Sequence, residues 1–303
     1  MEFVLDWVKE KKPLNFELLF GNNNAVQCEI GFGDGSFLVH KAKENPDKNF
    51  IGIDYSIVST KKASKKLSNS NLSNVILINL DAESAFQLLI PECSLEYIYV
   101  NFPDPWPKKK HHKRRLIDRS FSLLTASRSK KDGGLIIVTD DPFYRDFTLE
   151  EIVHYKVWRP IFKSGFVQRN EGYFETKYER KWRSLGKKIY YMQFKKVLHP
   201  IVEHKIVEFK YNDNIKIKVK PDKLRSFVYK PITMDDYFAK IISLNHHSEG
   251  LKFDVVLKDY SLFQKKTLSL GETPDNNTFI LKTPPDLFKG FSFKLLLETI
   301  RED

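Results

Sequence analysis

The feature that most constrains the fold is a regular alternation of short apolar runs with longer, helically patterned segments between residues 25 and 139. The apolar runs are 25–30, 50–53, 74–80, 95–100 and 135–139, and helical patterning falls at 36–44, 82–89 and 115–129. Strands that alternate with helices are typical of parallel sheets covered on both faces. The sequence therefore predicts an α/β fold with a doubly wound, mostly parallel sheet.

Acidic residues stand at or just beyond the ends of these runs. They are Glu29, Asp54, Asp81, Asp104 and Asp140. In open parallel sheets, ligands bind outside the carboxyl ends of the strands. We therefore expect a binding site lined by carboxylates at this edge.

The first run leads into a glycine turn that contains Gly31, Gly33 and Gly35. Such a turn also suits a nicotinamide dinucleotide, but carboxylates at Glu29 and Asp34 would repel a pyrophosphate. S-adenosyl-L-methionine has no phosphate, and its sulfonium and ammonium groups favour nearby carboxylates. Asp54 would then bind the ribose hydroxyls and Asp81 the adenine amine. A purely structural role as helix caps is the alternative, and it suits Asp81 best.

Residues 101–115 join a strand to a dense basic run. Prolines at 103, 105 and 107 fix the backbone around Asp104 and Trp106, which holds an acid and a ring in place at low entropic cost. Read separately, the prolines could simply end a strand and the basic run could be a solvated face. Together they predict a rigid reactive loop beside a polyanion-binding surface.

A second basic stretch, residues 177–188, carries six cations with Tyr178 and Trp182 between them. It could be a solvated loop, but cations interleaved with aromatic rings favour contact with phosphates and bases. Trp106 is equally compatible with stacking on a base and with lining a pocket.

Seven motifs, taken in order, resemble the tRNA (guanine-N7)-methyltransferases. They are Glu-Ile-Gly-Phe-Gly-Asp-Gly at 29–35, Gly-Ile-Asp at 52–54, Asp-Ala at 81–82, Phe-Pro-Asp-Pro-Trp-Pro-Lys at 102–108, Lys-Arg-Arg at 113–115, Thr-Asp at 139–140 and Thr-Lys-Tyr-Glu at 176–179. The loop with its prolines, acid and tryptophan is the most specific of them. The resemblance implies a Rossmann-like class I methyltransferase domain that uses S-adenosyl-L-methionine and acts on tRNA, with the variable-loop guanine (position 46) as its target.

The resemblance also implies roles for individual residues. Cofactor contacts fall on Glu29, Asp54, Asp81 and Asp104, beside the turn glycines Gly31, Gly33 and Gly35. Contacts to tRNA or to the guanine fall on Lys108, Lys110, His111, His112, Lys113, Arg114, Arg115, Asp140, Thr176, Lys177, Tyr178 and Glu179. Asp104 is the expected catalytic residue.

The chemistry of guanine N7 suits such a site. N7 has an in-plane lone pair and no proton to lose, so methyl transfer to it depends on positioning more than on a strong base. Positive charge develops on the imidazole ring, and a carboxylate at Asp104 or Asp140 would stabilise it or accept from the guanine N1–H and amino group. Two alternatives remain: an amino methyltransferase acting on RNA, DNA or protein, and a non-catalytic RNA-binding subunit.

Composition bounds the number of domains and the environment. A chain of 303 residues that is 41% hydrophobic can bury a large core and divide in two. Residues 1–197 carry 33 Lys and Arg against 24 Asp and Glu, or +9, and residues 198–303 carry 17 against 15, or +2. The cationic excess thus lies with the basic stretches, as expected for contact with nucleic acid.

Two cysteines provide neither a disulfide framework nor metal-ligand spacing, and no apolar run reaches membrane-spanning length. We therefore expect a cytoplasmic protein, monomeric or homodimeric, with tRNA as its partner and with neither a metal nor a membrane.

The pattern changes near residue 198, where we expect a methyltransferase domain (1–197) to give way to a β-rich domain (198–303) whose role the sequence does not reveal. Its strand-like runs are 206–211, 215–219, 227–229, 237–244, 251–257, 279–281 and 291–297. Its near-neutral charge argues against a primary role in RNA binding. Lysines at 216, 218 and 220 suit the solvent face of an edge strand.

Overall fold

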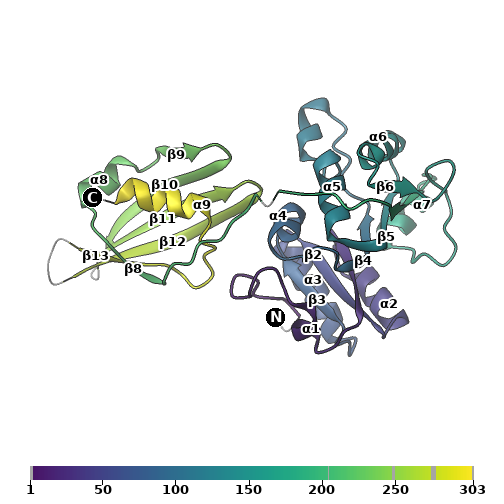
Figure 1. Ribbon diagram of the computed structural model, residues 1–303, viewed down its shortest axis with the longest axis horizontal. Coiled ribbons are helices and arrows are strands. Elements are labelled where there is room, and N and C mark those ends of the chain that lie inside the picture. Colours follow the sequence, from purple (N-terminus) through teal and green to yellow (C-terminus); the bar gives the residue numbers. More distant parts are fainter. Residues whose placement is uncertain (1–2, 204, 248–249, 274–277, 302–303) are drawn as a thin grey trace. The chain divides into compact units, whose positions relative to one another are not determined.

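The chain folds into two compact units, seen in the computed structural model (Figure 1), which describes residues 3–203, 205–247, 250–273 and 278–301. The first unit comprises residues 3–5 and 11–203. The second comprises Asp6–Glu10 and the described residues from 205 onward. The five N-terminal residues of the second unit include Trp7, whose ring centroid lies 6.0 Å from that of Phe288.

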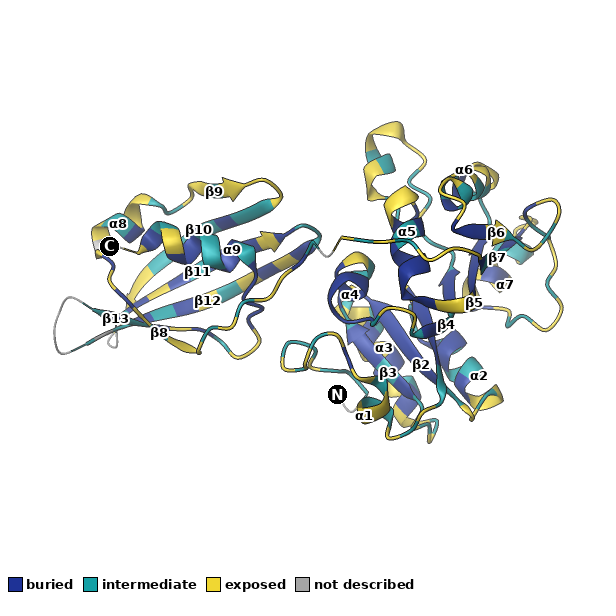
Figure 2. Ribbon diagram, viewed as in Figure 1, coloured by how far each residue is buried: buried dark blue, intermediate teal, exposed yellow. Residues whose placement is uncertain are grey.

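The first unit is built on a seven-stranded sheet with the order β3-β2-β1-β4-β5-β7-β6. Its strands are β1 (Ala25–Ile30), β2 (Lys48–Asp54), β3 (Val75–Asn79), β4 (Leu95–Asn101), β5 (Ser129–Thr139), β6 (Trp158–Pro160) and β7 (Tyr190–Lys196). The first five run parallel, and β7 runs antiparallel to β5 and to β6. In Figure 2, β2 is buried along almost its whole length, as a strand covered on both faces must be, and β4 is buried at Leu95 and from Ile98 to Val100. The predicted doubly wound, mostly parallel sheet is confirmed.

Side-chain caps mark where most helices of this unit begin. The helices are α1 (Phe16–Phe20), α2 (Ser36–Glu44), α3 (Ile57–Ser68), α4 (Ala82–Leu88), the 3₁₀ helix η1 (Lys109–Arg114), α5 (Arg119–Arg128), α6 (Pro142–Val153) and α7 (Lys177–Ser184). Asp118 accepts from the Phe121 backbone N–H at 2.7 Å, so α5 begins at Arg119 and not at 115 as predicted. The basic run before it forms the separate 3₁₀ helix.

The apolar residues among positions 1–21 predict a short amphipathic helix and an apolar lead-in in which Phe16, Leu18, Leu19 and Phe20 pack, and the structure differs from this. Val4 forms a parallel bridge with Leu77 of the edge strand β3, and helix starts only at Phe16. Leu18 in that helix is 80% exposed, so the expectation that it packs was wrong. Its apolar neighbours suggested packing because sequence alone does not reveal which side of a five-residue helix faces the sheet.

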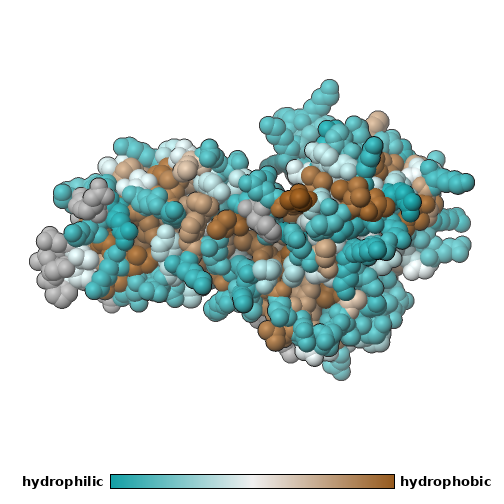
Figure 3. All heavy atoms as spheres, in the orientation of Figure 1, coloured by the Kyte–Doolittle hydropathy of each residue, from teal (hydrophilic) through white to brown (hydrophobic). Residues whose placement is uncertain are grey.

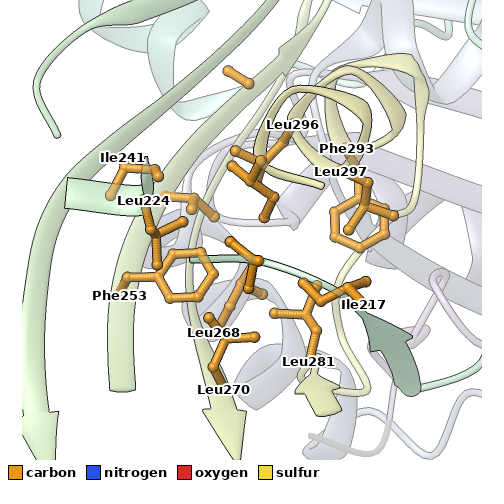
Figure 4. Close-up of a cluster of buried hydrophobic side chains, with 14 of the residues drawn as sticks. Ile217, Leu224, Ile241, Phe253, Leu268, Leu270, Leu281, Phe293, Leu296 and Leu297 are labelled. Atoms are coloured by element: carbon orange, nitrogen blue, oxygen red, sulfur yellow. The ribbon is translucent and has the colours of Figure 1, made fainter. Parts of the chain in front are cut away.

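The second unit is a six-stranded antiparallel sheet with the order β8-β13-β12-β11-β10-β9. Its strands are β8 (Asn214–Ile217), β9 (Pro231–Met234), β10 (Tyr237–His247), β11 (Gly250–Asp259), β12 (Leu262–Glu272) and β13 (Phe279–Lys282), and its helices are α8 (Pro221–Ser226) and α9 (Phe291–Ile300). Helix α9 packs on one face of the sheet, where Phe293, Leu296 and Leu297 meet Phe253, Leu268 and Leu281 (Figure 4). This cluster is a hydrophobic core of its own.

Three of the predicted strands in this region were wrong. Residues 206–211 and 227–229 form no strand, and residues 291–297 lie in α9. The buried positions of α9 are Phe293, Leu296, Leu297 and Ile300, whose spacing of three and four residues is helical. The alternation of Phe291, Ser292 and Phe293 imitated a strand. Conversely, β9 and the long strand β12 were not predicted.

Helix α9 begins under a cap supplied by a distant strand. Asp259, fully buried at the end of β11, accepts from the Ser292 backbone N–H at 2.9 Å and from its hydroxyl at 2.5 Å. A Cβ on Gly290 would lie 2.7 Å from the Asp259 carboxylate, so the close approach of the helix start requires glycine. From β12, Gln264 accepts from the Phe288 N–H at 2.8 Å and donates to its carbonyl at 3.0 Å.

We expect Asp259→Ala to destabilise the second unit by about 2–3 kcal/mol, because two buried donors lose their acceptor. Chemical denaturation followed by tryptophan fluorescence and circular dichroism measures this loss. The matched control is Asp222→Ala: its carboxylate is 93% exposed in a surface ion pair, and about 0.5 kcal/mol or less is expected. Equal stabilities of the two variants would contradict the cap.

Candidate functional site

The glycine turn between β1 and α2 has the backbone that its glycines predict. Gly31, Gly33 and Gly35 have φ values of 74°, 54° and 75°, in the left-handed region that favours glycine. No atom lies within 4 Å of where a Cβ on Gly31 or Gly33 would be, whereas a Cβ on Gly35 would meet Ala63 of α3 at 2.7 Å. The turn thus leaves space beside the first two glycines and packs tightly at the third.

Glu29 is the last residue but one of β1. The strand order of the sheet reverses at β1, which pairs with β2 on one side and with β4 on the other. Its side chain is buried, and Oε1 accepts from Asn101 Nδ2 at 3.0 Å. The other oxygen, Oε2, is buried and finds no donor among the described residues. Burial raises the pKa of Glu29 to about 8, against the lowering effect of the Asn101 hydrogen bond. An unsatisfied buried carboxylate oxygen at a strand-order switch is the strongest sign of a ligand for a cationic or donor group.

Asn101, the last residue of β4, was not among the predicted site residues. The Tyr173 hydroxyl donates to its Oδ1 at 2.7 Å, which orients the amide so that Nδ2 donates to Glu29. Tyr173 also packs edge-on against Tyr191 of β7, with ring centroids 5.4 Å apart. A polar residue at the end of a central strand was the available signal, but its partner lies 72 residues away.

The acids after β2 and β3 bind the backbone in different ways. Asp54 is buried, and its two oxygens accept from the N–H groups of Gly33 at 3.0 Å and Ser56 at 2.8 Å. Burial raises its pKa against these two hydrogen bonds. Each oxygen retains a lone pair for a further donor. Asp81 caps α4 by accepting from the Ser84 N–H at 2.9 Å, the structural role anticipated for it.

Asp34 contributes less negative charge to the turn than its position suggests. Its carboxylate forms an ion pair of 2.8 Å with Lys66 of α3 and accepts from the Ser36 N–H at 3.1 Å. The electrostatic case against a phosphate therefore depends mainly on Asp54, which no described cation pairs with, because burial favours the protonated form of Glu29.

The loop after β4 presents Asp104 to solvent. Asp104 is exposed and makes no ion pair or hydrogen bond with any residue that the structure describes. Trp106 is half-buried: the Arg114 guanidinium lies 4.6 Å from its ring centroid, and the His111 ring centroid lies at 5.7 Å. Phe102 and Trp106 both have positive φ, so the loop has a tightly specified backbone.

The basic run divides into outward and inward residues. Lys108, Lys110, Lys113 and Arg114 are exposed, and His111 and His112 are partly so. Arg115 turns inward: its Nε donates to the Pro105 carbonyl at 2.9 Å, and its guanidinium lies 4.3 Å from the Phe147 ring centroid in α6. Arg115 therefore ties the loop to a helix, although the resemblance implied a tRNA contact.

Thr176 and Glu179 occupy the start of α7. Thr176 Oγ1 accepts from the Glu179 N–H at 3.1 Å and caps the helix. Glu179 is buried; its Oε1 accepts from Arg183 Nε at 2.9 Å and from the Tyr191 hydroxyl, while Oε2 finds no donor among the described residues. Lys177 and Tyr178 in the same turn are exposed.

Asp140, just after β5, forms an ion pair with Lys187, whose ammonium lies 3.8 Å from the Trp182 ring centroid. The two basic stretches predicted to bind nucleic acid therefore differ in character. Most of the first projects freely, whereas part of the second folds back onto an acid and a ring.

The structure gathers these residues around one chain of contacts. Glu29, Asn101, Tyr173, Tyr191 and Glu179 follow one another through hydrogen bonds and one ring contact. At each end of this series of contacts, at Glu29 and at Glu179, lies a buried carboxylate with one unsatisfied oxygen. The site thus has one buried acid at the β1 turn and a second at α7, joined through residues that the sequence did not single out.

An open sheet with the order 3-2-1-4-5-7-6, antiparallel only at β7, and with carboxylates at the β1 and β2 ends, defines the class of Rossmann-like methyltransferases. A family model described as "Putative methyltransferase" matches residues 23–192.

Similar proteins specify the family. The chain is 35% identical over 249 residues to the tRNA (guanine-N(7)-)-methyltransferase of Thermotoga maritima, covering 76% of this chain and 78% of that one. It is 31% identical over 280 residues to the enzyme of the same name from Aquifex aeolicus, covering 91% of this chain and 93% of that one. The chain belongs to the tRNA (guanine-N(7)-)-methyltransferase family, which confirms the resemblance read from its motifs. The Aquifex match covers more residues than the first unit contains, so it extends into the second.

No helix in the described part of the chain has both the length and the apolar composition that crossing a membrane requires.

The buried Glu29 predicts an unusual pH dependence of stability. Its pKa is raised from 4.5 to about 8, so folding favours the protonated form, and this stabilisation is lost as the pH rises towards and through 8. In the free protein, Glu29→Gln should be as stable as the wild type near pH 4.5 and more stable at pH 9, by an amount on the order of a few kcal/mol. Urea denaturation at both pH values tests this. A variant that is less stable at pH 9 would show that Glu29 is ionised at little cost.

Proposed function

We propose that this protein transfers a methyl group from S-adenosyl-L-methionine to N7 of a guanine in tRNA, the variable-loop guanine at position 46, in the cytoplasm. The observation that carries the proposal is the unsatisfied Glu29 carboxylate oxygen beside the glycine turn. The loop after the neighbouring strand, β4, presents the free carboxylate of Asp104. Membership of the family supplies the substrate class.

The residues at the β1 and β2 ends fit the cofactor. Glu29 Oε2 is a buried acceptor without a donor, and an ammonium group would satisfy it and stabilise its ionised form. Asp54, held by two backbone donors, would accept from the ribose hydroxyls. Gly31 and Gly33 leave room for a close approach to the backbone. S-adenosyl-L-methionine supplies a methyl group on a sulfonium, which a nucleophile displaces.

Asp104 is proposed to serve the guanine side. A carboxylate free of protein donors on a loop with a specified backbone is available to hydrogen bond with the N1–H and amino group of guanine. It also opposes the positive charge that develops on the imidazole ring as N7 is methylated. Glu179 Oε2, buried and unpaired, is a second acceptor of the same kind at the start of α7.

The exposed residues Lys108, Lys110, Lys113 and Arg114 would hold tRNA phosphates. Their side chains project from η1 and the residue before it, immediately after the Asp104 loop. Phosphate contacts fix the register of the RNA without reading its sequence. A base drawn out of its tRNA contacts could then meet the loop.

Incubation with labelled S-adenosyl-L-methionine and unmodified tRNA, followed by nucleoside analysis, tests the activity. The expected product is 7-methylguanosine, lost when position 46 is changed to adenine. Methylation of another atom, or of protein, would overturn the proposal.

Asp104→Ala should lower kcat by about 100-fold or more without unfolding the protein, because its side chain is exposed and unpaired. Asp54→Ala should mainly raise the KM for the cofactor, by about 10-fold, because ribose contacts are made equally in the ground and transition states. Steady-state kinetics with each substrate varied separates the two effects. Near-normal turnover by folded Asp104→Ala would remove Asp104 from the mechanism.

The neighbours Arg114 and Arg115 should behave differently. Replacing Lys113 and Arg114 by Gln should weaken tRNA binding and reduce the salt slope of the binding constant by about 1–2. Arg115→Gln should leave that slope unchanged and instead lower kcat and thermal stability, because it frees the loop from α6. Filter binding across salt concentrations, with melting curves, distinguishes the roles. An Arg115 variant with a reduced slope and full stability would place Arg115 on the RNA instead.

A further inference from the structure

One face of the second unit's sheet carries no described helix. In an antiparallel sheet, residues paired across strands point to the same side, and sides alternate along each strand. Leu251, Phe253, Val255 and Leu257 of β11 point to the side of α9 and are buried. The alternate residues point to the opposite side, which we call the open face. Figure 3 views this unit from the α9 side, so the open face is turned away in that view.

The strand register places six lysines on the open face. They are Lys216 of β8, Lys240 of β10, Lys252 and Lys258 of β11, Lys265 of β12 and Lys282 of β13. Among outward positions of the described strands, Asp254 is the one acid. The face thus carries +6 and −1, or +5, although residues 198–303 together carry only +2 (17 cations less 15 acids). The folded sheet therefore places cations together on one face, although the net charge of these residues is near neutral.

The lysines of the open face are also unpaired. None of their six ammonium groups forms an ion pair or hydrogen bond with a described residue, and all of these lysines except the half-buried Lys240 are exposed. Three other lysines of this unit do have partners: Lys266, on the other side of β12, pairs with Asp286, Lys289 in the loop before α9 pairs with Asp213, and Lys294 of α9 pairs with Glu298. The one acid on the open face, Asp254, accepts instead from the hydroxyls of Ser243 and Thr267.

Two aromatic rings lie among these lysines. In the strand register, Lys258 lies opposite Phe238 of β10 on one side and opposite Phe263 of β12 on the other, and Phe263 is 62% exposed. A large exposed ring between cations offers a base-stacking surface next to phosphate contacts. Sheet faces with exposed aromatics are a recurrent platform for RNA.

Protection of sheet edges does not account for this arrangement. Lysines at edges prevent strand addition, but Lys252, Lys258 and Lys265 lie on β11 and β12, in the interior of the sheet. From Lys252 to Lys258 the patch extends about 20 Å along the strand, and from β8 to β10 about 19 Å across it. That is the footprint of an extended polyanion and not of a single bound anion.

We propose that the open face binds the sugar-phosphate backbone of tRNA, a second contact surface in addition to the basic run of the first unit. This rests on the proposed function, from which the identity of the polyanion is taken. The near-neutral charge of residues 198–303 argues against a primary role in RNA binding, and the cations gathered on one face support this secondary one.

The test variant is the full chain with Lys252, Lys258 and Lys265 changed to Gln. Its tRNA affinity at low salt should fall by about 10-fold or more, and the slope of log K against log salt should decrease by about 2–3. The KM for tRNA should rise with it, while kcat and the cofactor Kd stay unchanged. Phe263→Ala should weaken binding several-fold without changing the slope, since stacking involves no counterion release.

The matched control changes Lys210, Lys223 and Lys294 to Gln, which removes the same charge from residues outside the open face. Once the general effect of the lower net charge is allowed for, the tRNA affinity of this control should stay within about two-fold of the wild type. Its salt slope should be unchanged. Equal losses in both triple variants would overturn the proposal, because they would reflect net charge alone. A test variant with wild-type affinity and slope would overturn it as well.

Direct binding also separates this proposal from the proposed function. If the wild type binds tRNA through the three lysines but forms no 7-methylguanosine, the open face stands and the activity fails. If it forms 7-methylguanosine and the test variant binds normally, only the open face fails. Binding of the wild type to vesicles rich in phosphatidylserine, lost in the test variant while tRNA affinity is kept, would show a membrane surface instead. If the triple variant unfolds, the single variants must each reduce the slope by about 1.

Discussion

The structure of the site depends on a carboxylate removed from water. Glu29 is buried near the end of β1, and burial, together with the smaller effect of the nearby Asp54 and Asp34 carboxylates, opposes its ionisation. One amide hydrogen bond from Asn101 offsets part of that cost, and the second oxygen remains unsatisfied. A group in this state is destabilised until a cationic donor reaches it. The site is therefore built to favour a ligand of that chemistry.

The Asn101 amide extends this constraint beyond the β1 turn. The amide donates to Glu29 while its oxygen accepts from the Tyr173 hydroxyl. Tyr173 in turn packs against the ring of Tyr191, whose hydroxyl donates to Glu179. The chain of contacts joins β1 and β4 to β7 and α7, elements far apart in sequence. Buried polar networks of this kind specify geometry because each member leaves another unsatisfied when it moves. By contrast, Asp104 and most of the cations after it are exposed, which the proposed contact with a large and hydrated substrate requires.

Sequence patterns predicted the parts of this architecture that depend on local periodicity. The parallel sheet, the glycine turn and the acids at strand ends follow from apolar runs and from the residues that end them. The partners of those acids do not: Asn101, Tyr173 and Tyr191 contact Glu29 and Glu179 only through the fold. Arg115 is the clearest case. It lies in a run of cations and reads as one more phosphate contact, yet its neighbours in space are a carbonyl and an aromatic ring that make it a clamp for the loop. The roles assigned to the site residues from the family's motifs remain predictions.

The second unit shows a related limit of composition. A net charge of +2 over residues 198–303 argued against a primary role in RNA binding, but net charge is a sum, and binding depends on where the charges point. The strand register decides that question here: cations at 252, 258 and 265 share one side of the sheet, whereas Lys266, a single residue further, faces the other side and meets Asp286. Alternation with a period of two therefore converts a nearly neutral sequence into one face with unpaired cations and one with neutralised ones. The sequence of β11 shows the same alternation. It does not reveal the shared face, because β12 was not predicted as a strand and the pairing that aligns the two sets of lysines arises only in the folded sheet.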